Sequence, residues 1–184
     1  RVRLVDCVGF MVEGAAGHLE DGAERLVKTP WYDHEIPFTQ AAELGTRKVI
    51  TDHSTIGVVV TTDGSFSDLP QETYLDAENQ AISELKKLHK PFLVLVNSSH
   101  PSSRTAREAA ERIEKQHSVA AMPVNCAQLS EEDIRQIMEQ ILYEFPVSRV
   151  EFYMPKWVEM LPFSHPLKTG LIEKIRELTG KIRT

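Results

Sequence analysis

Apolar residues along this chain gather in short, nearly unbroken runs that end in turn-forming polar residues. Such runs are typical of strands that are buried on both faces of a parallel sheet. The two central runs are rich in valine, which favours strands. Four strands are predicted in this way, at Val2–Val5, Ile56–Val60, Phe92–Val96 and Val119–Val124.

The segments between these runs space their apolar residues three and four positions apart, which is the spacing of one helix face. Helices are predicted over about 39–52, 74–88, 106–117 and 131–142. The last of these follows Ser130 and opens with three acidic residues, a typical helix start. Because strands and helices alternate, we expect an α/β fold with a mostly parallel sheet and helices on both faces.

Polar residues mark the carboxyl ends of the predicted strands. They are Asp6, Asp63, Asn97 and Asn125. In open parallel sheets, ligands bind at this edge. The sequence therefore predicts a ligand site where these four side chains gather.

The alternation ends after residue 146. One more strand is predicted at Val147–Tyr153, and an amphipathic helix follows it. The apolar stripe of that helix consists of Leu167, Leu171, Ile175, Leu178 and Ile182. We therefore predict one domain over 1–146 and the start of a following region over 147–184.

The amino-acid composition and net charge argue against some classes of protein. The chain has 184 residues, of which 41% are hydrophobic and 26% charged, and its formal net charge is −6. This fits a globular domain, and the acidic balance disfavours a nucleic-acid partner. No run of ~20 apolar residues occurs, so no transmembrane segment is expected. The two cysteines give no disulfide framework, which indicates a reducing, cytoplasmic setting.

The first candidate motif is Asp6-Cys7-Val8-Gly9, at the end of the first predicted strand. In P-loop NTPases an acid at this place holds Mg²⁺, often through water. A glycine three residues later lets its backbone N–H approach the γ-phosphate. Asp6 and Gly9 are therefore the candidate catalytic residues, and Asp6 is also the candidate metal residue. An ordinary strand-end turn is the alternative.

The second candidate motif is Asn97-Ser98-Ser99-His100, at the end of a later strand. GTPases of the P-loop class carry N-K-x-D here, and the aspartate pairs with the guanine edge. His100 cannot offer the two acceptor oxygens of a carboxylate, so guanine selectivity is not expected and adenine becomes plausible. Asn97 and Ser98, with Asn125 in the loop after the last strand, are the candidate nucleotide-binding residues. A plain turn capped by Asn97 is the alternative.

The phosphate-cradling motif G-x-x-x-x-G-K-[ST] is missing from the 184 residues. In the translation-factor-related class of P-loop NTPases, the strand before that loop lies between the strands predicted at residues 2–5 and 56–60. Two explanations remain: the P-loop interpretation is wrong, or the N-terminal part of the domain lies outside this sequence. The chain starts at Arg1 rather than Met, and we expect a piece of a longer protein.

Several long strings of this sequence resemble the stage IV sporulation protein A family. The resemblance extends from about Val2 to Trp157. Its strings are Arg3–Gly9, Thr29–Tyr32, Ile36–Phe38, Ala41–Ile50, His53–Val59, Thr61–Gly64 and Tyr143–Val147. The resemblance implies a P-loop ATPase of spore-forming bacteria that uses ATP and Mg²⁺. It makes Asp6 the magnesium acid and Gly9 the phosphate-sensing glycine.

The resemblance also implies partners and a location. The family polymerises with itself into the basement layer of the spore coat. A small amphipathic membrane peptide recruits it, and other coat proteins dock on it. Its place is the mother-cell cytoplasm, at the outer forespore membrane. The family's C-terminal half, like its Walker A loop, is absent from this sequence.

The stretch 10–55 interrupts the alternation of strands and helices. It contains three glycines between residues 14 and 22, followed by an aromatic cluster at Trp31–Phe38. We interpret it as an enlarged switch region that couples nucleotide state to contacts between subunits. The alternative is that its aromatic residues only pack as a lid on the sheet. For the protein as a whole, the alternatives to an assembling ATPase are a non-catalytic scaffold that retains a nucleotide-binding fold and a GTPase fragment.

Overall fold

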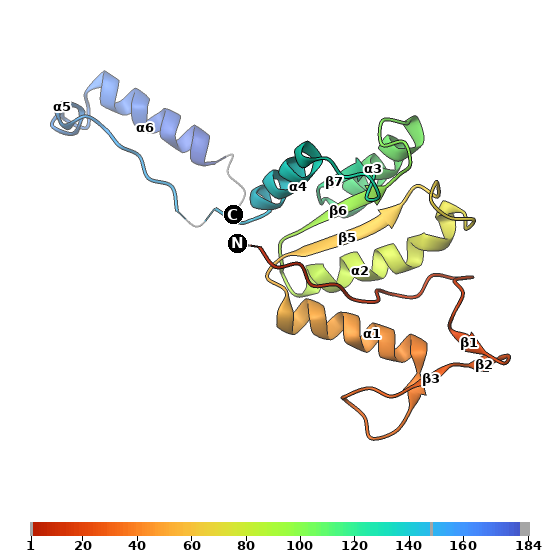
Figure 1. Cartoon of the computed structure of the whole chain (residues 1–184). Helices are drawn as coiled ribbons and strands as arrows, with labels where there is room; N and C mark the ends of the chain where they lie inside the picture. The colour runs from red at the N-terminus through yellow and green to blue at the C-terminus, as the bar shows by residue number, and fades with distance from the viewer. Residues whose placement is uncertain (1, 148, 181–184) are drawn as a thin grey trace. The chain divides into compact units, whose positions relative to one another are not determined.

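The structure is a computed structural model that describes residues 2–147 and 149–180 (Figure 1). The chain divides into two compact units, Arg1–Glu144 and Phe145–Thr184. Within the described residues, no helix is long and apolar enough to cross a membrane.

The first unit is built on a three-stranded parallel sheet. Its strands are β5 (Gly57–Thr62), β6 (Phe92–Asn97) and β7 (Ala121–Val124), in the order β5-β6-β7. Val59 lies opposite Val94, and Leu95 lies opposite Met122. Three of the four strands predicted for this domain are therefore confirmed, as is the α/β class. The central strand β6 is buried along its apolar length, which explains its unbroken run of apolar residues.

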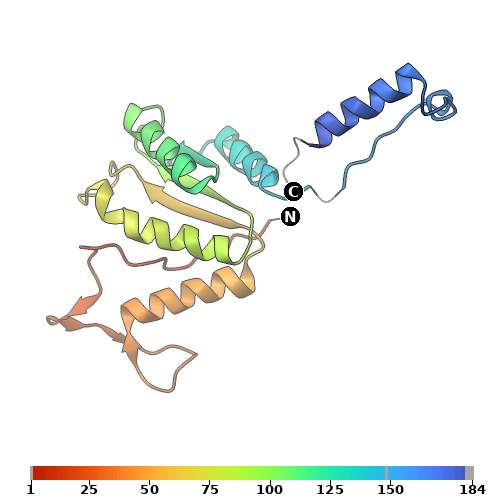
Figure 2. The same ribbon diagram turned by 180° about the vertical axis from the view of Figure 1, so that it is seen from behind.

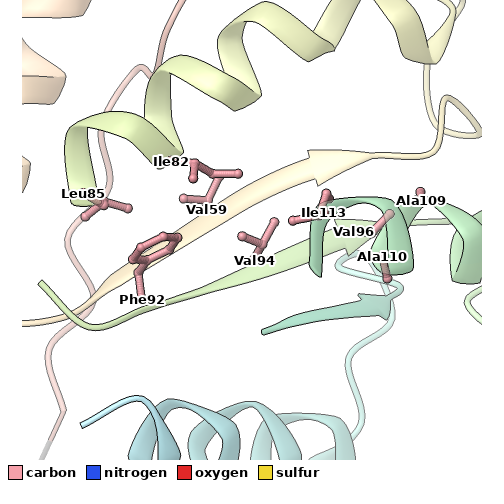
Figure 3. Close-up of a cluster of buried hydrophobic side chains, with 9 residues drawn as sticks. All are labelled: Val59, Ile82, Leu85, Phe92, Val94, Val96, Ala109, Ala110 and Ile113. Carbon is pink, nitrogen blue, oxygen red and sulfur yellow. The ribbon is translucent and has the colours of Figure 1, made fainter. Parts of the chain in front are cut away.

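Helices cover both faces of this sheet, as predicted. Helices α2 (Leu75–Lys87) and α3 (Arg104–His117) pack on one face, where Ile82 and Ile113 are fully buried against Val94 (Figure 3). On the other face, α4 (Glu131–Tyr143) packs Ile137 and Ile141 against Leu93 and Leu95. Figure 2 shows the same layers from behind.

The start of α4 follows the predicted local chemistry. The Ser130 hydroxyl accepts from the Asp133 backbone N–H at 3.1 Å, and the Asp133 carboxylate accepts from the Ser130 backbone N–H at 2.8 Å. This reciprocal capping box satisfies two backbone donors at the helix terminus. The hydrogen bonds from Ser130 also lower the pKa of the Asp133 carboxyl below its ordinary value.

The stretch 10–55 contains two small antiparallel pairs and one long helix. β1 (Leu19–Glu20) pairs with β2 (Ala23–Glu24), and β3 (Leu26–Val27) pairs with β4 (Ile36–Pro37). Asp21 and Gly22 join the first pair with φ of 51° and 81°, as a two-residue hairpin turn requires. The predicted helix at 39–52 is confirmed as α1 (Phe38–Lys48), which continues into the π-helical turn η1 (Val49–His53). A 3-10 turn, η2 (Gln71–Tyr74), precedes α2.

The predicted strand at Val2–Val5 is wrong for this structure. Val2–Val5 has no regular secondary structure, and Leu4 is 90% exposed. Among the described residues no strand pairs with this segment. A strand is stabilised by hydrogen bonds to a neighbouring strand, so β-forming side chains alone do not produce one.

The second unit is helical. It contains α5 (Lys156–Glu159) and α6 (Pro166–Thr179), and the buried Lys168 ammonium donates to the Glu159 and Leu161 carbonyl oxygens. The predicted amphipathic helix is confirmed as α6, although Ile182 lies outside the described residues. The strand predicted at Val147–Tyr153 is wrong, because its described residues have no strand structure. Residue 148 of that stretch lies outside the described residues.

Candidate functional site

The carboxyl ends of β5, β6 and β7 meet at one edge of the sheet, where a polar network centres on Asp63. One carboxylate oxygen of Asp63 accepts from the Ser65 backbone N–H at 3.0 Å and from the Ser65 hydroxyl at 2.6 Å. The other oxygen accepts from the Ser98 hydroxyl at 2.7 Å. Partial burial raises the pKa of this carboxyl, but the hydrogen bonds from Ser65 and Ser98 outweigh burial and leave the pKa below its ordinary value.

Asn97 connects this network to the loop after β7. Its side-chain oxygen accepts from the Cys126 backbone N–H at 2.9 Å, and its carbonyl accepts from the Asp63 N–H at 3.4 Å. Asn125 shapes the same loop, because its side-chain oxygen accepts from the Ala127 N–H at 3.1 Å. Four side chains were predicted to gather at this edge. The strand ends at Asp63, Asn97 and Asn125 are held together by hydrogen bonds, whereas Asp6 is not part of this network and accepts from the Cys7 N–H instead.

Ser98 has a structural part in this network. It is fully buried, and its hydroxyl donates to Asp63 while accepting from the His100 backbone N–H at 3.1 Å. The following residues are also tied down, since the Ser99 backbone N–H donates to the Ser65 hydroxyl at 2.8 Å. Contact between Ser98 and a nucleotide stays a prediction. The two hydrogen bonds of Ser98 fix the loop that contains His100.

Asp6 and Gly9 lie in a different part of the first unit. Asp6 is exposed, and one of its carboxylate oxygens accepts from the Cys7 backbone N–H at 2.9 Å. A single exposed carboxylate fits Mg²⁺, which usually keeps several waters and takes one or two protein oxygens. Among the described residues no group of three or more candidate ligands forms a metal cage. The magnesium role of Asp6 stays a prediction.

Gly9 is fixed by a residue that sequence reasoning missed. Its φ of +88° lies in the left-handed region, which glycine adopts without strain. The Gly9 N–H donates to the Thr46 hydroxyl at 2.9 Å, and that hydroxyl donates back to the Gly9 carbonyl at 3.1 Å. Thr46 lies inside α1, and it is only 3% exposed. No local pattern marks a single threonine within a helix as the partner of a distant glycine.

A cavity of about 440 Å³ separates this segment from the sheet. Asp6, Gly9 and Thr46 line one part of it, and β5 residues from Gly57 to Thr61 line another. Within the described chain, β5 pairs with β6 along one edge and with no strand along the other. Val58 and Val60 on β5 are 42% and 58% exposed. The D-x-x-G segment therefore lies beside an open strand edge, across a cavity that is apolar over much of its lining.

Glu78, which lines the cavity, forms an ion pair that the sequence did not indicate. The carboxylate of Glu78, on α2, lies 2.8 Å from the Arg112 guanidinium on α3. Its second oxygen accepts from the Thr61 hydroxyl of β5 at 2.8 Å. The Glu78 side chain is 1% exposed and the Arg112 side chain 31% exposed, so a buried carboxylate connects two helices and the edge strand.

Comparison with known proteins places these features in a family. The family model described as the ATPase domain of stage IV sporulation protein A matches residues 1–146. Stage IV sporulation protein A of Clostridioides difficile is 45% identical over 186 aligned residues, which cover 100% of this chain and 38% of that relative. The Bacillus subtilis protein of the same name is 39% identical, with 99% of this chain and 37% of the relative covered. The chain thus spans somewhat over a third of the length of these relatives. No solved structure matches.

Proposed function

Because the chain belongs to the family of stage IV sporulation protein A ATPase domains, we propose that its parent protein hydrolyses ATP with Mg²⁺ to assemble a spore coat layer. The match to the ATPase-domain family model supports the proposed ATP hydrolysis. The proposed role in sporulation is supported by the names of the relatives. The single structural observation that supports a nucleotide site is the D-x-x-G segment lying beside the open edge of β5.

The fold within this proposal is that of the P-loop NTPases related to translation factors. A further strand, outside the 184 residues, would pair with the free edge of β5. The phosphate loop and a helix would follow that strand, and the helix would cover Val58 and Val60. Exposed valines and unpaired backbone groups on one strand edge are what such an addition would bury. The relatives have ample length for this portion.

Asp6 and Gly9 have distinct roles in this site. The Asp6 carboxylate would hold Mg²⁺ through a water molecule, and Mg²⁺ would offset the charge of the phosphates. The Gly9 N–H would donate to the γ-phosphate, since glycine lets the backbone come close to a ligand. Phe10 takes the next position, where many GTPases place a glutamine that orients the attacking water. A phenyl ring forms no such hydrogen bond, so intrinsic turnover is slow.

The edge built around Asn97 would receive the base. Asn97 and Asn125 both hold the loop after β7, and Ser98 fixes the backbone that leads to His100. His100 replaces the carboxylate that guanine recognition requires, which favours adenine. In this arrangement Asn97 and Ser98 position the site through the protein's own hydrogen bonds.

The assembly steps of the proposal follow the family. The protein polymerises with itself in the mother-cell cytoplasm, on the surface of the outer forespore membrane. A small amphipathic peptide recruits it, and other coat proteins attach to the layer. The stretch 10–55, with its two strand pairs and α1, is the switch region that would transmit nucleotide state to neighbouring subunits.

Equilibrium binding tests this proposal against its alternatives. The full-length protein is titrated with a non-hydrolysable ATP analogue and with the corresponding GTP analogue, each with Mg²⁺ and with EDTA. We expect tighter binding of the ATP analogue, and weaker binding when Mg²⁺ is removed. Much tighter binding of the GTP analogue would identify a GTPase. Binding of neither analogue would identify a scaffold that has kept the fold without its ligand.

A further inference from the structure

Gly9 and Thr46 are joined by two hydrogen bonds that run in opposite directions. The Gly9 N–H donates to the Thr46 hydroxyl at 2.9 Å, and the hydroxyl returns its own hydrogen to the Gly9 carbonyl at 3.1 Å. The two residues are 37 positions apart in the chain. Thr46 is buried, so these bonds form with little competition from water. Both backbone polar groups of Gly9 are thereby engaged by one side chain.

This pairing competes with a phosphate. A backbone N–H carries a single hydrogen, and it cannot donate in good geometry to a hydroxyl and to a phosphate oxygen at different positions. In the proposed function, the Gly9 N–H is the donor to the γ-phosphate. The Thr46 hydroxyl therefore occupies the contact by which ATP would be distinguished from ADP.

Thr46 also connects Gly9 to helix α1 and the loop that precedes it. A Cβ added to the neighbouring Gly45 would lie 3.5 Å from the Trp31 ring, and the Lys48 ammonium lies 5.7 Å from the centre of that ring. α1 and the loop that carries Trp31 thus pack together. Any movement of Thr46 away from Gly9 moves this part of the switch region with it.

The turn that follows Thr46, at the C-terminal end of α1, is anchored. The Lys90 ammonium, in the turn before β6, donates to the carbonyl oxygens of Ile50, Thr51 and Ser54 at 2.5, 2.9 and 2.6 Å. These carbonyls belong to the π-helical turn at Val49–His53 and to its end. Short π-helical segments often occur at functional positions, where the helix ladder is irregular. The C-terminal end of α1 is therefore held twice, to Gly9 through Thr46 and to Lys90 through the carbonyls about one turn further on.

We propose that Thr46 is a latch on the nucleotide site, which ATP opens by taking the Gly9 N–H. Opening breaks both Gly9–Thr46 bonds and frees α1 to pivot on its Lys90 anchor. ADP has no γ-phosphate and leaves the latch closed. The inference rests on the proposed ATP site, and it adds the step by which ATP and not ADP reaches the switch region.

The latch makes ATP binding weaker than it would otherwise be, and ADP binding is unaffected. Thr46→Val keeps the shape of the side chain and removes the hydroxyl, so ATP no longer has to break two hydrogen bonds. We expect the ratio of the ADP to the ATP-analogue dissociation constants to rise about 3- to 10-fold in this variant, the usual range for one net hydrogen bond. Thr46→Ser keeps the hydroxyl and is expected to retain the wild-type ratio.

The experiment is calorimetric titration of the full-length protein with ADP and with a non-hydrolysable ATP analogue. Wild type, Thr46→Val, Thr46→Ser and the control Thr39→Val, at the other end of α1, are compared. An unchanged ratio in Thr46→Val, or an equal rise in Thr46→Ser, would overturn the latch while the ATP site stands. Failure of the wild type to bind the analogue would overturn the proposed function itself.

Hydrogen exchange gives a readout that needs no variant. In the wild-type protein, backbone amides of α1 are expected to exchange faster with the ATP analogue than with ADP. The amides of η1, next to the Lys90 anchor, are expected to exchange equally with both. Equal exchange of α1 in the two nucleotide states, with both nucleotides shown to bind, would contradict the latch.

Discussion

The Asp63 carboxylate accepts the Ser98 hydroxyl hydrogen at 2.7 Å, and this bond joins the end of β5 to the end of β6. The same carboxylate holds Ser65, whose hydroxyl accepts from the Ser99 backbone N–H. One ionised side chain therefore organises two neighbouring loops at the edge where a nucleotide base is proposed to lie. Its charge is the property to test.

Asp63→Asn is expected to lower the unfolding temperature at pH 7, because an amide is a weaker acceptor than a carboxylate. The hydrogen bonds lower the pKa of Asp63 in the folded protein, so its stabilisation is complete above the ordinary pKa of about 3.9. That stabilisation is lost as the pH falls further, through the folded-state pKa. Thermal unfolding from pH 7 to pH 3 measures it. The difference in unfolding temperature between wild type and Asp63→Asn should become smaller below pH 4. A difference that grows there would contradict the stabilising role of the Asp63 charge.

Arg112→Ala tests the buried ion pair with Glu78. The variant leaves a carboxylate with 1% exposure without its cation, and we expect a loss of about 3 kcal/mol in the free energy of unfolding. Arg104→Ala is the matched control, because its partner Glu108 is on the same helix and both side chains are exposed. Denaturant unfolding compares the two. Equal effects of the two substitutions would show that burial does not matter at Glu78.

The reactivity of Cys7 can probe the D-x-x-G segment, with Cys126 as the comparison site. Cys7 is exposed next to Asp6, whereas burial raises the pKa of the Cys126 thiol. A thiol reagent at neutral pH is expected to modify Cys7 faster, and Mg²⁺ with the ATP analogue is expected to slow that reaction. Mass spectrometry of the full-length protein measures both sites. Undiminished labelling of Cys7 at saturating nucleotide would place the ligand elsewhere.

The phenyl ring of Phe10 leads us to expect a low turnover number for ATP hydrolysis. It is nearly buried and offers no hydrogen bond to a water molecule. We expect the turnover number for ATP to stay below ~10 s⁻¹, the median for enzymes. Steady-state phosphate release by the full-length protein gives this number. A faster enzyme would show that another group orients the attacking water in the absence of partners.

Much of the sheet could be predicted because its residues act locally. The apolar run of β6 and the Ser130 capping signal each specify an element through their immediate neighbours. The strand ends at Asp63 and Asn97 could be placed together for a similar reason, since parallel strands end at a common edge. These predictions needed only periodicity and the geometry of α/β folds.

The remaining features depend on partners far away in the chain. Val2–Val5 has the composition of a strand but has no pairing neighbour among the described residues. The Thr46–Gly9 bonds span 37 positions, and the Glu78–Arg112 contact spans 34. Neither pair leaves a periodic signal. The first joins α1 to an irregular segment and the second joins α2 to α3, and the sequence pattern does not contain the relative placement of these parts.

The most direct test of the proposed activity is the rate of ATP hydrolysis by full-length protein with Mg²⁺, for wild type and for Asp6→Ala. Glu173→Ala, which removes an exposed carboxylate from α6, is the control. We predict hydrolysis by the wild type and the control, and a loss of at least about 100-fold in Asp6→Ala, because a metal at the phosphates contributes several kcal/mol. Equal rates in wild type and Asp6→Ala would contradict the account.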